Sequence, residues 1–165
     1  VLKDDPKMTC RVDGLGYKSP AIIVLDRKLK ITTQSFISKN AKKIKTIILH
    51  NSINKKKTRN LKKRGIKFHK ISSDTDGNLN LLEALLLLKK IGFSRIFVES
   101  GINLITSFLK KKLVDDFKLF ISNNKLKKNG SGNAKNVLNK FLKNKKFNKD
   151  TINLCGDVLK TYKLQ

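Results

Sequence analysis

The sequence predicts a single α/β domain with a mostly parallel central sheet, flanking helices and antiparallel closing strands. Short apolar runs alternate about four times with segments whose apolar residues recur at helical spacing, which is typical of parallel strands joined by helices. The last segments are strand-like and surround Gly156 and Asp157, a hairpin-type turn, so we expect the closing strands to be antiparallel. A chain of 165 residues is long enough for a real core, and we expect one domain over residues 1–165.

Three strands are predicted in the first half of the chain. Ala21–Leu25 is fully apolar and rich in β-branched residues, as in a central strand of a parallel sheet. Lys45–Leu49 is the next apolar run, and Ile66–Ile71 alternates apolar and polar residues, as in a strand exposed on one face. Before the first strand, the sequence predicts a turn or helix entry at Asp4 and Asp5, ahead of Pro6, and a loop over 13–20.

Helices are predicted between and after these strands. A lysine-rich surface helix spans Asn54–Arg64 and ends at Gly65, and an amphipathic helix spans Leu79–Ile91 and ends at Gly92. The connection over 31–42 is polar, and we expect a short helix at most.

The stretch Arg95–Asp116 predicts a strand, a turn and a helix. Ile96–Val98 is a short apolar run that predicts a buried strand, and apolar residues recur at helical spacing from Leu104 onward. Glu99 follows the predicted strand and Gly101 precedes the helix, whose unpaired N–H groups are suited to a phosphate. The turn therefore suits a ligand with hydroxyl and phosphate groups, but a plain strand–turn–helix with a polar turn explains the same pattern.

The remaining third of the chain predicts a strand, a loop, a short helix and two closing strands. These elements are, in order, Phe117–Ser122, a flexible loop over 123–134, Ala134–Leu142, Thr151–Leu154 and Val158–Leu164. The predicted turn between the two closing strands is the one that contains Gly156.

The net charge of +26 is the strongest compositional signal. A protein this basic attracts nucleic acid electrostatically, but its lysines are spread along the whole length, and arginine, the residue that bidentate recognition favours, is scarce. Asn and Ile are also abundant, which is the composition of an AT-rich genome. We therefore expect no specific binding of nucleic acid.

Membrane, metal and disulfide chemistry are not expected from this composition. No apolar run approaches the length that spans a bilayer, and no signal peptide is visible. The two cysteines, Cys10 and Cys155, lie far apart without histidine or cysteine partners at metal-binding spacing. We expect reduced thiols, a cytoplasmic location and no metal site.

Charged and polar side chains follow the first two predicted strands. Asp26 and Arg27 end the first strand; in a nucleotide-binding sheet an acidic residue there favours NAD, whereas a basic residue suits the 2′-phosphate of NADP. One residue of each kind leaves this open, and either can be a plain loop position. His50 ends the second strand, and we interpret it as a polar cap rather than as a contact to an adenosine.

Several segments in the same order resemble one family, the reductase domain of the bifunctional riboflavin-biosynthesis deaminase–reductase, which has a dihydrofolate-reductase-like fold. The resemblance is carried by the opening run LKDDPKMTCR, the strand that ends at Asp26, the turn VESGINL, the run LVDD before the next strand, and the terminal GDVLKTY. Each motif is modest alone, but the first and the third in one chain are fairly specific, and together they span nearly all of the sequence.

The resemblance implies NADPH-dependent reduction of 5-amino-6-(5-phosphoribosylamino)uracil to its ribitylamino counterpart, by an enzyme that forms a homodimer.

 The dimer is an expectation from the resemblance only. Within the motifs, Asp4 would contact NADPH, and Arg27 falls near the 2′-phosphate. The residues matched to the cradle of the dinucleotide phosphates are Gly101, Ile102, Asn103, Leu104, Ile105, Thr106 and Ser107. Met8, Arg11 and Glu99 would bind the substrate, with Arg11 suited to its phosphate.

The chain also departs from the family pattern. The family's first strand and part of its substrate loop would lie before Val1, and the zinc deaminase domain has no counterpart in the sequence. We expect a fragment that lacks its N-terminal part, cannot deaminate and reduces poorly alone. Two alternatives stay open: another dihydrofolate-reductase-like reductase of a pterin or pyrimidine, and a basic nucleic-acid-binding module.

Overall fold

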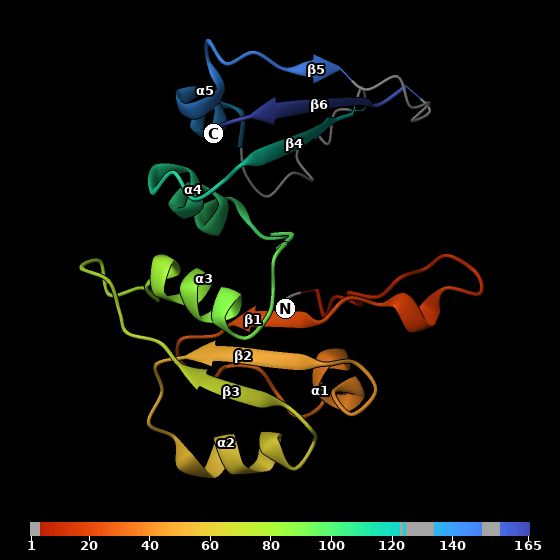
Figure 1. The fold of residues 1–165 in the computed structure, drawn as a ribbon, viewed down its shortest axis with the longest axis vertical. Helices are drawn as coiled ribbons and strands as arrows, with labels where there is room; N and C mark the ends of the chain where they lie inside the picture. Colours follow the sequence, from red (N-terminus) through yellow and green to blue (C-terminus); the bar gives the residue numbers. More distant parts are fainter. Residues whose placement is uncertain (1–3, 123, 125–133, 150–155) are drawn as a thin grey trace. The chain divides into compact units, whose positions relative to one another are not determined.

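The computed structural model describes residues 4–122, 124, 134–149 and 156–165. The chain falls into two compact units, Val1–Ser94 and Arg95–Gln165. The first unit contains the parallel sheet expected from the alternating strands and helices, and the second contains the antiparallel closing strands (Figure 1). Among the described residues, no helix combines the length and apolar character needed to cross a membrane.

Three parallel strands form the sheet of the first unit, in the order β1-β2-β3. They are β1 (Ile22–Leu25), β2 (Thr46–His50) and β3 (Lys67–Lys70). All five residues of β2 are buried, because this strand has a neighbour on each side and helices over both faces. The predicted strands are confirmed, with small differences at their ends.

Helices cover both faces of this sheet, as Figure 1 shows. On one face, α1 (Phe36–Asn40) and α2 (Lys55–Lys62) contribute Ile37 and Leu61 to a cluster with Val24 and Ile48. On the other face, α3 (Leu81–Lys90) packs Ala84 and Leu88 on Ile47 and Leu49. Successive residues of a strand point to opposite faces, so the all-apolar runs supply both cores at once.

Side-chain caps fix where these helices begin. Asn54 accepts a hydrogen bond from the Lys57 N–H at the start of α2, and Asn80 accepts one from the Glu83 N–H at the start of α3. Gly65 and Gly92, predicted to follow the two helices, adopt φ values of +91° and +98°, the left-handed conformation that glycine enters without steric cost.

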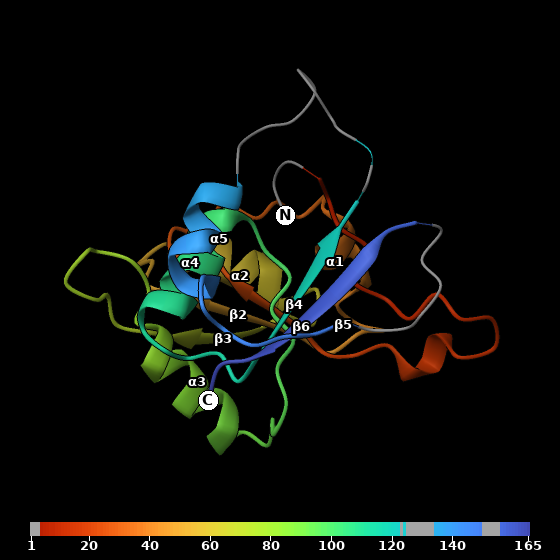
Figure 2. The ribbon, with the colours of Figure 1, turned by 90° about the horizontal axis from the view of Figure 1, so that it is seen from above.

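The second unit is built on an antiparallel sheet in the order β4-β6-β5. Its strands are β4 (Asp116–Ile121), β5 (Asn148–Lys149) and β6 (Val158–Lys163). Two helices, α4 (Ile102–Lys110) and α5 (Ala134–Leu142), lie against each other and share an apolar cluster with the sheet (Figures 1 and 2). The predicted helix over 134–142 and the strand at the chain end are confirmed.

One strand predicted for this unit is absent from the structure, and another lies outside the described residues. The predicted buried strand Ile96–Val98 is wrong in the structure: the segment belongs to no strand, and Phe97 is 79% exposed. An apolar run specifies a side-chain pattern, but a strand exists only where another strand supplies backbone partners. The predicted strand Thr151–Leu154 and most of the loop over 123–134 lie outside the described residues.

The burial pattern makes a direct prediction for stability. Replacing Leu61, which is completely buried in α2, with alanine leaves a cavity and should lower the free energy of unfolding by about 2–5 kcal/mol. The matched control is Leu86→Ala in α3, whose side chain is 58% exposed and whose loss should change the free energy by less than about 0.5 kcal/mol. Urea unfolding of both variants measures the difference; equal losses would contradict the assigned core.

Candidate functional site: a cationic hollow at the carboxyl ends of the parallel strands

Parallel pairing brings the residues that follow the three strands to one edge of the sheet. The Asp26 N–H donates to the Leu49 carbonyl at 2.9 Å, and the Asn51 N–H donates to the Arg27 carbonyl at 3.1 Å. On the other side of β2, the Ile71 N–H donates to the His50 carbonyl at 2.8 Å. The ladder therefore continues past the strand ends and fixes the first residues of each loop. Open α/β sheets bind their ligands at this edge.

Asp26 has a structural role in its loop. Its two carboxylate oxygens accept hydrogen bonds from the Lys30 N–H at 2.8 Å and the Ile31 N–H at 2.7 Å. These bonds turn the chain away from β1 and lead it into the buried residues Leu29 and Ile31. Of the two charged residues that end β1, the carboxylate is therefore engaged with backbone.

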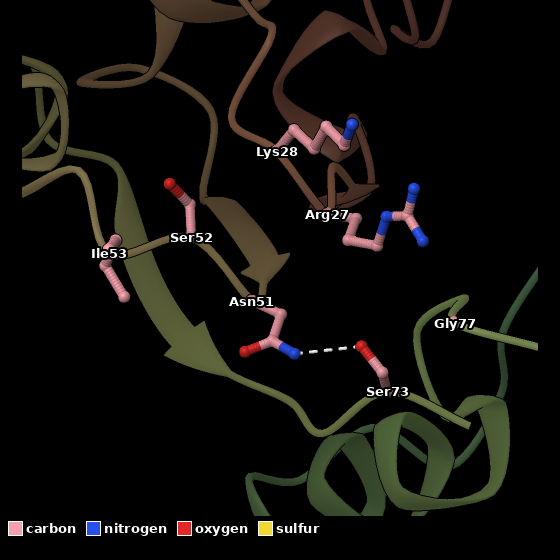
Figure 3. A pocket seen from close by; sticks show the side chains of 7 residues that line it. All are labelled: Arg27, Lys28, Asn51, Ser52, Ile53, Ser73 and Gly77. Atoms are coloured by element: carbon pink, nitrogen blue, oxygen red, sulfur yellow. Dashed lines mark hydrogen bonds between the residues drawn. The ribbon is translucent and has the colours of Figure 1, made fainter. Parts of the chain in front are cut away.

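A hollow of about 320 Å³ opens beside Arg27, the other charged residue (Figure 3). It is lined by residues from the ends of β1 and β2 and from the loop after β3: Arg27, Lys28, Asn51, Ser52, Ile53, Ser73 and Gly77. Asn51 Nδ2 donates to Ser73 Oγ at 2.9 Å, which links two of the loops, and leaves the amide oxygen of Asn51 as a further polar group. The lining has two cations and no acidic residue, so it suits an anion.

Gly77 lies beside the guanidinium of Arg27. A Cβ built on Gly77 would lie 3.5 Å from Arg27 Nη1, and the φ of Gly77 is +72°. The tight turn from Asp74 to Gly77 is held by the Gly77 N–H, which donates to the Asp74 carbonyl at 2.9 Å. The backbone conformation therefore favours glycine at this position, whereas the 3.5 Å distance is an ordinary van der Waals contact.

His50, at the end of β2, is 8% exposed. Its Nδ1 accepts a hydrogen bond from the Ser52 N–H at 3.1 Å, which agrees with the predicted capping role. Burial lowers the pKa of His50 below the ordinary value of 6.5, and the positive charges of Lys70 and Lys62 act in the same direction. The imidazole is therefore neutral at pH 7, with its proton on Nε2.

In the second unit, the predicted helix after Gly101 is present. Gly101 is the N-cap of α4 and provides no side-chain cap, and no acceptor among the described residues bonds to the N–H groups of Ile102 and Asn103. Gly101 has an ordinary φ of −69°, and a Cβ placed on it would meet no atom within 4 Å. Glu99, which precedes it, is exposed. An open helix N-terminus of this kind is suited to a phosphate.

The other residues matched to the family motifs lie in the N-terminal segment of the first unit. Asp4 and Arg11 are exposed, and Met8 is half-buried against the cluster that contains Ile37. No helix begins at Asp5, and the N-cap of α1 is Ser35; the Asp5 carboxylate instead accepts two bonds, of 2.9 and 3.0 Å, from the Phe36 N–H, 31 residues away at the start of α1.

Sequence reasoning missed several residues of the hollow, namely Lys28, Asn51, Ser73 and Gly77. The available signal was position, because Asn51 and Ser73 follow two predicted parallel strands as Arg27 follows the first. Their side chains meet only because the strand ends are in register, and residue type alone did not single them out.

Comparison with known proteins places these observations in a family. The family model described as the RibD C-terminal domain matches residues 1–125. The chain belongs to this family. The riboflavin biosynthesis protein RibD of Aquifex aeolicus (strain VF5) is 30% identical over 122 residues, which are 74% of this chain and 32% of that protein. The family predicted from the sequence motifs is confirmed.

Solved structures show the same fold. Two structures of Acinetobacter baumannii RibD, named form 2 and form 1, match with TM-scores of 0.68 and 0.69 at 18% identity. Each comparison covers 99% of this chain and 44% of the other chain. The chain therefore spans less than half the length of the RibD proteins that it matches, and at this identity the likeness shows the fold alone.

The lowered pKa of His50 predicts how stability depends on pH. Above pH 6.5, His50 is neutral in both the folded and the unfolded chain; as the pH falls through 6.5 toward the folded-state pKa, the unfolded chain binds more protons and stability is lost. His50→Asn keeps an acceptor for the Ser52 N–H and removes the titration, so its stability should fall less between pH 7.5 and 5.5. Urea unfolding at both pH values measures this; an equal fall in the two proteins would contradict it.

Proposed function

We propose that the chain is an NADPH-dependent reductase domain that converts 5-amino-6-(5-phosphoribosylamino)uracil to the ribitylamino compound in riboflavin biosynthesis. The observation that carries the proposal is the cationic hollow at the carboxyl ends of the parallel strands, in a chain that belongs to the RibD C-terminal domain family. The printed name of the Aquifex relative, a riboflavin biosynthesis protein, supports the pathway.

The hollow fits the 2′-phosphate of NADPH rather than the free hydroxyl of NADH. A phosphate needs cations and hydrogen-bond donors, and Arg27 and Lys28 supply cations beside the polar groups of Asn51 and Ser52. A carboxylate that would instead favour a ribose hydroxyl is not available, because Asp26 is bonded to the N–H groups of Lys30 and Ile31. This arrangement supports NADPH as the cofactor.

The open N-terminus of α4 supports a second contact to the dinucleotide. The uncapped N–H groups at Ile102 and Asn103 and the empty space at Gly101 suit a pyrophosphate close to the backbone. The segment Gly101–Ser107 has this role in the proposal, and Asp4 contacts the cofactor elsewhere.

Three residues are proposed to bind the substrate. The exposed guanidinium of Arg11 suits the substrate phosphate, and the exposed carboxylate of Glu99 suits hydroxyl or amino groups of the ribosylaminouracil. Met8 gives an apolar contact. When bound, the reduced nicotinamide supplies hydride to C1 of the ring-opened ribose; the residues of the chain bind and orient the reactants. A homodimer and a cytoplasmic location stay predictions from the resemblance.

The cofactor assignment predicts a selective loss in Arg27→Ala. Removal of a charge-assisted hydrogen bond should weaken the binding of 2′,5′-ADP by about tenfold or more and leave the binding of 5′-ADP unchanged. Isothermal titration calorimetry measures both affinities. Lys30→Ala is the matched control, since Lys30 is an exposed cation in the same loop that does not line the hollow. Equal weakening of both nucleotides by Arg27→Ala would contradict the assignment.

The proposed contact at α4 predicts that Gly101→Val weakens the binding of NADPH without unfolding the chain. The φ of Gly101 is one that valine adopts and a Cβ built there meets no atom within 4 Å, but the branched side chain fills the space that a phosphate would occupy. Gly16→Val is the control, because a Cβ there also meets no atom within 4 Å and Gly16 is not among the residues assigned to the cofactor. Fluorescence titration should show a lower affinity for NADPH in Gly101→Val only. Normal NADPH affinity in that variant would contradict the proposed contact between α4 and the cofactor.

The substrate assignment predicts that Glu99→Gln, which preserves the side-chain shape, lowers turnover of the phosphoribosylaminouracil with NADPH and leaves NADPH affinity unchanged. Steady-state kinetics separate the two effects. Unchanged turnover would show that Glu99 has no role with the substrate.

A further inference from the structure

A second hollow lies at the ends of β2 and β3, on the face of the sheet that α2 covers. Its volume is about 490 Å³, which falls within the range of roughly 300–1,000 Å³ that small-molecule sites occupy. The residues that line it come from β2, β3, α2 and the loop between β2 and α2: His50, Ser52, Ile53, Lys55, Thr58, Arg59, Lys62 and Lys70. Four are permanent cations at neutral pH, and none is acidic.

The cations of α2 that line this hollow share one face of the helix. Lys55, Arg59 and Lys62 are four and three residues apart, the spacing of neighbours on a helix surface. The helix Lys55–Lys62 contains no acidic residue, so these like charges repel one another without a counter-charge on their own element. A bound anion would relieve that repulsion.

His50 and Lys70 approach the same hollow from the sheet. They are register partners on β2 and β3, so their side chains emerge on the same face. Because His50 Nδ1 accepts from Ser52, the neutral ring has its N–H at Nε2, and no acceptor among the described residues bonds to that group. Among the described residues no buried side-chain nitrogen or oxygen lacks a partner, so this N–H is open to solvent in the hollow although the side chain as a whole is more than nine-tenths buried.

This convergence differs from the general spread of lysine along the chain. Composition alone distributes lysines without regard to the fold, whereas here one helix face and two strand ends direct basic groups to one hollow. Burial is the main cause that lowers the pKa of His50; the charges of Lys70 and Lys62 add to it, and the carboxylate of Asp26 opposes it.

We propose that this hollow binds a compact anion with two or more phosphate groups, which Arg59, Lys62 and Lys70 neutralise and to which His50 Nε2–H donates. The site goes beyond the proposed reductase function. It shares Ser52 and Ile53 with the neighbouring hollow, but its cations are different from Arg27 and Lys28.

A compact ligand fits this site better than nucleic acid does. Single-stranded nucleic acid is bound along extended grooves in which bases stack on aromatic side chains, and no phenylalanine, tyrosine or tryptophan lines this hollow. The cations converge from three elements, which suits clustered phosphates rather than a phosphate backbone that passes along a surface.

The test is calorimetric titration of the 165-residue chain with inorganic tripolyphosphate at about 0.15 M salt, where long-range charge effects are largely screened. We expect saturable binding of one ligand per chain. The double variant Lys62→Ala, Lys70→Ala should weaken binding about tenfold or more. The control Lys56→Ala, Lys63→Ala removes the same charge from exposed positions outside the hollow and should stay within about twofold of the parent.

A second readout reports on His50 and does not depend on the lysine variants. In NMR titrations with and without tripolyphosphate, the pKa of His50 should rise on binding, because a negative charge beside the imidazole favours its protonated form against burial and the charges of Lys70 and Lys62. His50→Asn keeps the acceptor for the Ser52 N–H and removes Nε2, so it should also weaken binding of the anion.

Each of the following results would overturn the proposal: no saturable binding, equal weakening by the two lysine pairs, or an unchanged His50 pKa. Weakening by Arg27→Ala rather than by the Lys62 and Lys70 pair would place the anion in the neighbouring hollow. Tighter binding of an oligothymidylate that depends on the same lysines would identify nucleic acid as the partner instead. Retained 2′,5′-ADP affinity in the Lys62 and Lys70 variant separates this test from that of the reductase function.

Discussion

Parallel pairing on the central strand β2 is the constraint on which the first unit depends. Strand β2 is buried along its whole length, bonds to β1 and β3, and contributes alternate residues to the apolar clusters on both faces. Because all three strands run the same way, the first residues of three loops are brought to one edge. The hydrogen bonds from Asp26 to Leu49, from Asn51 to Arg27 and from Ile71 to His50 then fix these loops relative to one another.

The chemistry of this edge follows from how its polar groups are used. Asp26 and His50 are engaged with backbone N–H groups, so they shape the loops, while Arg27 and Lys28 have no acidic neighbour in the hollow that they line. The result is a cationic surface with hydrogen-bonding groups beside it, which suits a phosphate. The second hollow beyond His50 arises from the same edge, since α2 follows β2 directly and presents one basic face toward Lys70.

Much of the fold and part of the site were predictable from the sequence. Continuous apolar runs predicted β1 and β2, Gly65 and Gly92 marked the ends of α2 and α3, and the DDP and VESG motifs predicted the family. Ile96–Val98 shows the limit: its apolar pattern is strand-like, yet the pattern carries no information about a pairing partner. Asn51 and Ser73 show a second limit of sequence-based prediction, because their contact depends on the register of strands that are distant in sequence.

The most direct test of the account is a thermal melt of the chain alone, with NADPH and with NADH at equal concentrations. A ligand that binds only the folded state raises the midpoint according to its concentration relative to its dissociation constant. The account predicts a cooperative melt whose midpoint rises more with NADPH than with NADH, because the cations at the strand ends bind the 2′-phosphate. A cooperative melt that NADH raises as much as NADPH, or that neither raises, would contradict it.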